Sequence, residues 1–288
     1  MHPGQWIDRT LYPFTPHYIT LEDQQVHYID EGSGTPIVFV HGTPVWSFLY
    51  RRFVADLSRD YRCVALDHLG FGLSDKPALA SYRPEDQARR FAHLLDQLEL
   101  REITLVVHDF GGPIGLSHAL AHPERVRKLI IFNTWMWPMN DDPAVVRMGK
   151  IFSSRLGKLL YTRFNISPRL FYPLVFGDRS KLRRDVQQQY IQATSAPDQR
   201  MALWACACAI TGSSDWYAQL WAQRERLSAI PALLLWGMKD PTFTPKQLVR
   251  WQSVFTNVHT VQFAESGHFV QEEQPERAIN EIRRFLQA

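Results

Sequence analysis

The chain has 288 residues, of which 45% are hydrophobic and 21% are charged. This size and composition are typical of a soluble globular protein with one large α/β domain and an insertion, or with two small domains. The formal net charge is only +3, and no cluster of Lys and Arg is interleaved with aromatic residues, so we expect no nucleic-acid partner. No apolar run approaches the length that spans a bilayer, and the first ten residues lack the apolar core of a signal peptide. We therefore expect no transmembrane segment and a cytoplasmic location.

The sequence contains no cysteine pattern or nucleotide motif that indicates a bound metal or cofactor. The three cysteines, Cys63, Cys206 and Cys208, are an odd number without C-x-x-C spacing, which predicts neither a disulfide framework nor a zinc site. Neither G-x-G-x-x-G nor G-x-x-x-x-G-K-[ST] occurs, so no motif indicates a nucleotide site.

Strands and helices alternate in the first 133 residues. Alternation of apolar and polar residues at 18–21 and 25–31 predicts an antiparallel hairpin at a sheet edge. Apolar runs predict strands at residues 36–40, 61–66, 103–107 and 126–132. Between them, we expect helices from Ser47, as N-cap, to residue 58, from 84 to 98, and from the turn after residue 107 to 122.

The pattern changes from residue 134 to about residue 227. Strand-like runs vanish, and short helical patterns rich in Trp, Tyr and Phe are separated by prolines. Strands resume at residues 232–236 and 259–263, and helices are expected from Pro245 and Pro275. We predict a mostly parallel sheet with helices on both faces. Residues 1–133 and 228–288 would form this core, and residues 134–227 an inserted helical cap.

Asp109 occupies the turn after the strand predicted at residues 103–107. It is followed by Gly111, Gly112 and Gly115. Small residues at such a strand-to-helix turn are typical of a nucleophile elbow, here with Asp in the place usually held by Ser. The structural alternative is an ordinary turn in which Asp109 caps the helix.

Two further polar residues follow later strands. Asp240 lies in the turn after residues 232–236, and His268 in the turn after residues 259–263. Ligands of such sheets bind at the carboxyl ends of the strands, so Asp109, Asp240 and His268 are candidates for one site. Their order along the chain is that of the nucleophile, acid and histidine of α/β-hydrolases. Each also has a structural interpretation, since Asp240 could initiate a turn before Pro241 and His268 could be a buried, hydrogen-bonded histidine.

Across nearly its whole length the sequence resembles the haloalkane dehalogenases, a branch of the α/β-hydrolases with close relatives among the epoxide hydrolases. The resemblance is carried by HGTP at residues 41–44, WSFLYR at 46–51, DHLGFGLSDKP at 67–77, HDFGG at 108–112, GMKD at 237–240 and GHFVQE at 267–272. It implies an α/β-hydrolase fold in which Asp109 is the nucleophile, His268 the base and Asp240 the acid that orients His268.

A carboxylate nucleophile indicates a particular chemistry. At an sp3 carbon it displaces a leaving group and forms an alkyl ester, whereas acyl transfer would give a labile anhydride. His268 would then activate water to attack the ester, with the backbone N–H groups of Thr43 and Phe110 as oxyanion donors. We therefore expect a small apolar substrate and water as partners. The sequence leaves open whether the protein is a monomer or a homodimer.

Two positions depart from the family pattern. Dehalogenases usually hold the leaving halide between a Trp directly after the nucleophile and a Trp, or an Asn of the H-G-x-P loop, where this chain has Phe110 and Thr43. Phe has no N–H to donate, and the Thr hydroxyl is a weaker, differently placed donor. Trp46, Trp135 or Trp137 could replace these donors, although core packing explains such side chains equally well.

The sequence therefore does not decide the identity of the leaving group. Haloalkane dehalogenation is the favoured reaction, and β-lactone decarboxylation is an alternative on the same three residues. Epoxide hydrolysis would need acidic donors, for which the predicted cap offers Tyr161, Tyr172, Tyr190 and Tyr217. A non-catalytic binding protein is the remaining hypothesis, but a nucleophile, acid and base would be unnecessary for binding alone.

Overall fold

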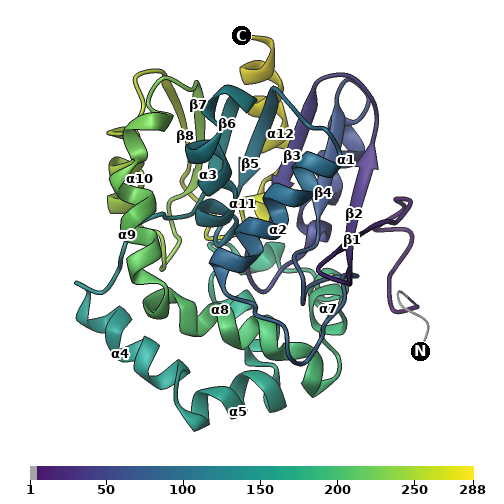
Figure 1. Ribbon diagram of the computed structural model, residues 1–288, viewed down its shortest axis with the longest axis vertical. Coiled ribbons are helices and arrows are strands. Elements are labelled where there is room, and N and C mark those ends of the chain that lie inside the picture. Colours follow the sequence, from purple (N-terminus) through teal and green to yellow (C-terminus); the bar gives the residue numbers. More distant parts are fainter. Residues whose placement is uncertain (1–4) are drawn as a thin grey trace.

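The computed structural model describes residues 5–288 and has an eight-stranded sheet at its centre (Figure 1). The strands are β1 (His17–Leu21), β2 (Gln24–Glu31), β3 (Pro36–Val40), β4 (Arg62–Leu66), β5 (Ile103–Val107), β6 (Val126–Phe132), β7 (Ala232–Gly237) and β8 (Val258–Phe263). Their order across the sheet is β1-β2-β4-β3-β5-β6-β7-β8. β2 pairs antiparallel with both β1 and β4, and all the other pairs are parallel.

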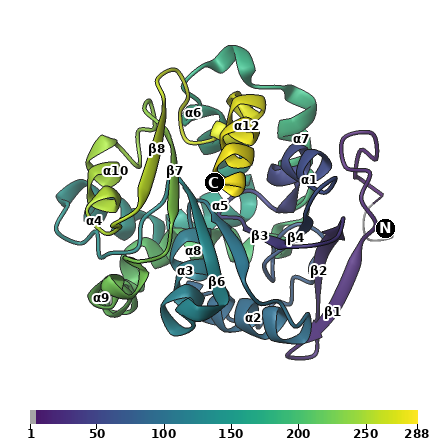
Figure 2. The same cartoon turned by 90° about the horizontal axis from the view of Figure 1, so that it is seen from above.

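Helices cover both faces of this sheet. Helix α1 (Arg51–Leu57) packs against α12 (Pro275–Gln287), and α2 (Pro84–Gln97) packs against α3 (Gly111–Ala121). Figure 2 shows these two pairs on opposite sides of the sheet. Strands β5 and β7 are buried along their whole length, which explains why their sequences are continuously apolar rather than alternating. The predicted α/β-hydrolase architecture is confirmed.

The helix expected to start at Ser47 begins differently from the prediction. A 3-10 turn, η1 (Ser47–Tyr50), precedes α1, and the N-cap position of η1 is Trp46. The prediction that Ser47 is a cap was wrong, because its polar groups have other partners: the side chain is bonded to the Tyr12 hydroxyl at 2.6 Å, and the amide donates to Asp67 Oδ1 at 2.8 Å. Both interactions join distant segments, so local helix rules do not reveal them.

The segment between β6 and β7, which we call the helical insertion, contains the remaining large group of helices. They are α4 (Pro143–Phe152), α5 (Arg155–Phe164), a π-helical turn (Ser167–Phe171), α6 (Tyr172–Leu174), α7 (Arg184–Gln192), α8 (Met201–Gly212) and α9 (Ser214–Ala222), with 3-10 turns at Arg179–Lys181, Pro197–Arg200 and Arg224–Leu227. In Figure 1, α4 and α5 lie farthest from the sheet, with α8 packed against both. Several prolines that the sequence suggested as separators instead begin helices, as Pro143 does in α4, where a missing N–H costs nothing.

Three further short elements connect the strands and helices of the core. The 3-10 turn η2 (Pro123–Arg125) leads into β6, α10 (Pro245–Gln252) lies between β7 and β8, and α11 (Val270–Glu273) precedes α12. Cys63, Cys206 and Cys208 are free thiols.

None of the helices within residues 5–288 is both long and apolar enough to cross a bilayer.

Candidate active site

Asp109 lies in the turn between β5 and α3, with a left-handed backbone conformation of φ 52°. Such a conformation is costly for a residue with a side chain, and it lifts the carboxylate above the end of the sheet. The next turn is crowded, because a Cβ at Gly111 would clash with the carbonyl oxygen of Val40, and one at Gly112 with Thr134 Oγ1. Close packing therefore explains these two glycines.

The carboxylate of Asp109 is held by the loop after β3. The backbone N–H of Thr43 donates to Asp109 Oδ1 at 2.7 Å. Gly42 permits this approach, since a Cβ there would collide with the same carboxylate. Burial raises the pKa of Asp109 above its ordinary value, while the charge of His268 and the N–H groups of Phe110 and Thr43 offset part of the rise.

His268 lies between two carboxylates. Its Nδ1 is 2.7 Å from Asp240 Oδ2, and its Nε2 is 3.7 Å from Asp109 Oδ2. A proton on Nδ1, donated to Asp240, leaves the Nε2 lone pair facing Asp109. Burial alone would lower the pKa of His268, but the charge and hydrogen bond of Asp240 and the charge of Asp109 outweigh it, so the pKa is raised.

Asn133, at the end of β6, holds Asp240 in place. Its Nδ2 donates to Asp240 Oδ2 and to the carbonyl oxygen of Gly237, both at 3.0 Å, and its Oδ1 accepts from the Gly237 N–H at 2.8 Å. The sequence analysis missed this role. A polar residue directly after an apolar strand, at the sheet edge that carries Asp109, was the signal that could have revealed it.

Glu273 joins the His268 loop to the helical insertion. Its Oε1 accepts from the Gly267 N–H at 2.7 Å, and its Oε2 accepts from the Asp178 N–H at 2.8 Å. The backbone N–H of His268 donates to the carbonyl oxygen of Val175 at 2.9 Å. The segment around Val175 is thus attached to the loop that places the imidazole.

A cavity of about 340 Å3 opens beside Asp109 and His268. Its wall is mostly apolar, and the helical insertion contributes much of it through Val145, Met148, Phe152, Phe171, Leu174 and Val175. Trp135 and Phe110 also line the cavity, with their rings edge to face at 4.8 Å. Trp135 Nε1 and Thr43 Oγ1 are buried and have no hydrogen-bond partner within residues 5–288. An unpaired buried N–H is costly unless a ligand accepts from it.

The structure separates the three tryptophans that were candidates for this pocket. Only Trp135 of the three is among the cavity-lining residues. Trp46 is fully buried against Tyr12, with ring centroids 4.8 Å apart. Trp137 packs on Trp221 at 4.9 Å. The expectation that Trp46 or Trp137 could line the pocket is therefore corrected, because both belong to packed aromatic clusters.

The four tyrosines considered as epoxide donors also differ in whether they line the cavity. Tyr161 and Tyr172 line the cavity. The hydroxyl of Tyr190 donates to Glu272 Oε1 at 2.5 Å, and Tyr217 packs against Trp135 at 5.6 Å.

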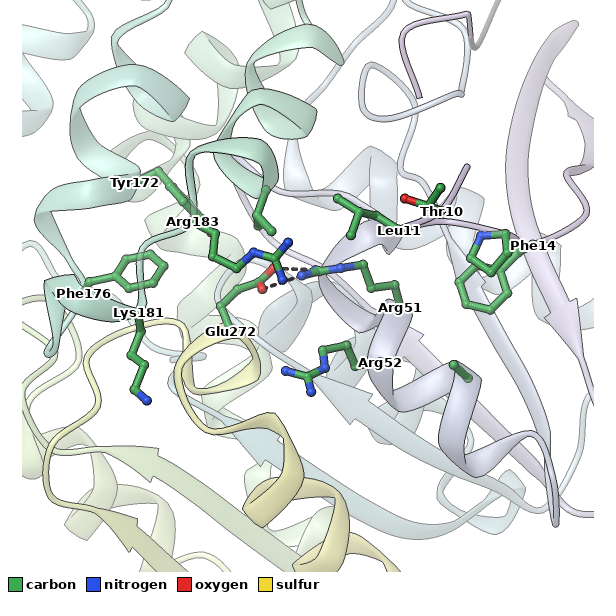
Figure 3. A pocket seen from close by; sticks show the side chains of 13 residues that line it. Thr10, Leu11, Phe14, Arg51, Arg52, Tyr172, Phe176, Lys181, Arg183 and Glu272 are labelled. Carbon is green, nitrogen blue, oxygen red and sulfur yellow. Dashed lines mark hydrogen bonds and ion pairs between the residues drawn. The ribbon is translucent and has the colours of Figure 1, made fainter. Parts of the chain in front are cut away.

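A second cavity, of about 360 Å3, is also lined by Tyr172 (Figure 3). Arg51 forms a two-point ion pair with Glu272 there, at 2.6 and 2.8 Å, and the Arg183 side chain approaches the pair. Because Tyr190 of α7 bonds to the same Glu272, this buried pair fixes the insertion to α1 and α11. We assign it a structural role.

Within the part of the chain that the structure describes, no three His, Cys, Asp or Glu side chains are grouped as metal ligands.

Comparisons with known proteins agree with this geometry. The family model for the alpha/beta hydrolase fold matches residues 35–275. A haloalkane dehalogenase 2 of Mycobacterium tuberculosis is 33% identical over 96% of this chain and 97% of its own length. A cis-3-alkyl-4-alkyloxetan-2-one decarboxylase of Shewanella oneidensis is 32% identical over 96% of this chain and 90% of its own. The solved structure of a mutant of the haloalkane dehalogenase DatA from Agrobacterium tumefaciens superposes with a TM-score of 0.86, at 27% identity and 99% coverage of both chains.

The chain belongs to the α/β-hydrolase fold family. Within it, the chain is an enzyme of the haloalkane dehalogenase-like kind, and the resemblance found in its sequence motifs is confirmed.

Proposed function

We propose that the enzyme hydrolyses haloalkanes to alcohols and halide ions through an ester on Asp109. A carboxylate oxygen of Asp109 attacks the carbon that bears the halogen, a C–O bond forms, and the C–halogen bond breaks with both electrons leaving on the halide. The observation that carries this proposal is the alignment of Asp240, His268 and Asp109 at the wall of an apolar cavity. We infer the roles of acid, base and nucleophile from that alignment.

Water then removes the alkyl group. His268 Nε2 takes a proton from a water, whose oxygen attacks the ester carbonyl carbon. When the tetrahedral intermediate collapses, the C–O bond to the alkyl oxygen breaks and His268 returns the proton to that oxygen, so the alcohol leaves. The carboxyl group of Asp109 then releases its own proton to solvent and regains its charge. The N–H groups of Thr43 and Phe110, which already face the Asp109 carboxylate, would stabilise the oxyanion. Esterification also removes the charge of Asp109, one cause of the raised pKa of His268. The imidazole is therefore more readily neutral at the step in which it acts as base.

Trp135 is our candidate donor for the departing halide. Its buried, unpartnered Nε1–H and its place in the wall beside Phe110 suit it to a role that Phe110 cannot fill. Thr43 Oγ1, also buried without a partner in the described residues, is a second donor. We propose further that residues 134–227 act as the cap that closes the apolar side of the cavity.

The direct test is halide release from a short bromoalkane by the Asp109→Asn variant. Loss of the nucleophile should lower the rate by at least about 10³-fold. Asp215→Asn, at an exposed position of α9, is the matched control and should behave like the unmodified enzyme. Halide release by the Asp109 variant at the unmodified rate would contradict the proposal.

β-Lactone decarboxylation is the second candidate, favoured by the similar Shewanella decarboxylase and by the absence of an N–H on the side chain of Phe110. A cis-3,4-dialkyl β-lactone that loses carbon dioxide leaves an alkene, whereas a bromoalkane gives bromide and an alcohol. Epoxide opening, for which Tyr161 and Tyr172 are available, would give a diol. Rates on the three substrates, each with the Asp109→Asn control, decide among these reactions.

A further inference from the structure

The outer side of the helical insertion carries a concentration of exposed apolar side chains. Ten large hydrophobic residues are exposed within residues 5–288, and seven of them lie between residues 148 and 174, each 47% to 58% exposed. They are Met148, Ile151, Leu156, Leu159, Phe164, Leu170 and Leu174, which we call the apolar face. Single exposed apolar residues are ordinary, but a group of this size marks an interaction site.

The same stretch is strongly basic. Residues 143–177 contain no Asp or Glu and six basic residues, Arg147, Lys150, Arg155, Lys158, Arg163 and Arg169. All six are exposed, and none forms an ion pair with a carboxylate in the part of the chain that the structure describes. Outside this stretch the chain is net negative, because all 29 of its Asp and Glu residues lie there and the net charge of the whole chain is only +3.

The residues of the apolar face on α4 and α5 lie in the layer farthest from the sheet, and two residues of the face also line the active-site cavity. Helices α4 and α5 lie farthest from the sheet in Figure 1. Spacing of three residues places Met148 beside Ile151 on α4, and Leu156 beside Leu159 on α5. Met148 and Leu174 belong both to the apolar face and to the cavity wall. The apolar face is therefore continuous with the wall of the cavity beside Asp109.

We propose that the apolar face binds the surface of a membrane that contains anionic lipids, with α4 and α5 lying in its interface. Half-exposed leucines and phenylalanine enter the boundary of the acyl chains, while the interspersed Arg and Lys side chains reach the lipid phosphates. An apolar substrate dissolved in the bilayer then enters the cavity without crossing water. This last step rests on the proposed function, but the binding of the surface does not.

Charge distinguishes this occupant from a second copy of the chain. Two copies joined through the same face would bring together twelve cationic side chains and no carboxylate from residues 143–177, which like-charge repulsion disfavours. An anionic bilayer supplies both the missing charge and the apolar medium.

Co-sedimentation with vesicles tests the proposal. We expect the protein to bind vesicles of 70% phosphatidylcholine and 30% phosphatidylglycerol, to bind phosphatidylcholine alone much more weakly, and to be released by salt. The double variant Arg155→Gln/Lys158→Gln should lower the partition coefficient by about 25-fold, at about fivefold for each charge. Leu156→Gln/Phe164→Gln should lower it by at least about tenfold. Val249→Gln is the matched control, since Val249 is 63% exposed on α10, outside the apolar face.

Several results would overturn the inference: no binding to the anionic vesicles, equal binding to both vesicle types, or unchanged binding by the two double variants. Sedimentation velocity without lipid tests the alternative that the apolar face binds another protein chain. If the unmodified protein is an oligomer that does not bind vesicles, and the double variants are monomers, the apolar face is a protein interface instead. Asp109→Asn should bind vesicles normally, so failure of the proposed chemistry and failure of membrane binding are distinguishable.

Discussion

At the scale of single residues, a substitution tests the proposed role of the Trp135 indole as donor to the leaving halide. Trp135→Phe keeps an aromatic ring in the cavity wall but removes the N–H. We predict that the rate of bromide release falls by about 10- to 100-fold, because a preorganised donor to a developing negative charge is lost. Trp137→Phe is the control, since Trp137 packs on Trp221 away from the cavity. Equal rates for the two variants would remove Trp135 from the mechanism.

The protonation of His268 sets a pH dependence. Its pKa is raised above the ordinary histidine value of 6.5, against the effect of burial, by Asp240 and Asp109. His268 is lost as a base when it is protonated, so activity should fall on acidification. In the ester intermediate Asp109 is uncharged, and of these two carboxylates only Asp240 then raises the pKa of His268. Asp240→Asn removes the largest cause of the rise and should move the midpoint of the remaining activity to lower pH. A pH–rate profile checks both statements, and an unmoved midpoint would show that another group titrates.

The three candidate residues, Asp109, Asp240 and His268, could be found from sequence because each follows a predicted strand of a parallel sheet. Such a pattern fixes which edge a residue occupies. It does not fix which tryptophan faces a cavity. Trp46, Trp135 and Trp137 are all buried, and only three-dimensional packing separates Trp135 from the other two.

At the scale of elements, the tight turn from β5 into α3 depends on glycines that have no space for a side chain. Gly112→Ala would place a methyl group against Thr134 Oγ1, and we predict a loss of about 1 to 3 kcal/mol in the free energy of unfolding together with reduced halide release. Gly212→Ala in α8 meets nothing within 4 Å and should be neutral or stabilising by up to about 1 kcal/mol. Urea unfolding of both variants tests the contrast. A Gly112 variant as stable as the Gly212 variant would refute the packing argument.

Element prediction succeeded where hydrophobic runs are long and failed where distant contacts dominate. The predicted strands at residues 36–40, 103–107 and 126–132 coincide with β3, β5 and β6. The helices of the insertion were expected only as a group, because prolines such as Pro143 and Pro197 start helices and turns there as well as interrupt them. How that group docks, and hence the shape of the cavity, depends on contacts such as that of Tyr190 with Glu272, 82 residues away.

At the scale of the whole molecule, one buried carboxylate makes stability depend on pH. Burial alone would raise the pKa of Asp67, but His27 and the N–H of Leu73 lower it to about 2, below the ordinary value of 3.8. On acidification, the carboxylate of Asp67 is therefore protonated at a higher pH in the unfolded chain than in the folded protein. The contribution, about 2 kcal/mol, is present above about pH 4 and is lost as the pH falls toward 2.

Unfolding free energies measured between pH 5 and pH 2 test this linkage. The slope should be smaller in Asp67→Asn than in Asp215→Asn, the exposed control. Should Asp67→Asn fail to fold, titration of Asp67 by NMR in the unmodified protein gives the same answer. A pKa at or above 3.8 would contradict the assignment.

The covalent intermediate proposed on Asp109 can be detected from the mass of a His268→Gln variant. Without the base, the alkyl ester should persist after incubation with 1-bromobutane. We expect a mass increase equal to a butyl group in place of one hydrogen, with no bromine retained, located by peptide mapping on Asp109 and absent from the His268→Gln/Asp109→Asn double variant. An adduct on another residue, or the same adduct in the double variant, would show that Asp109 is not the nucleophile.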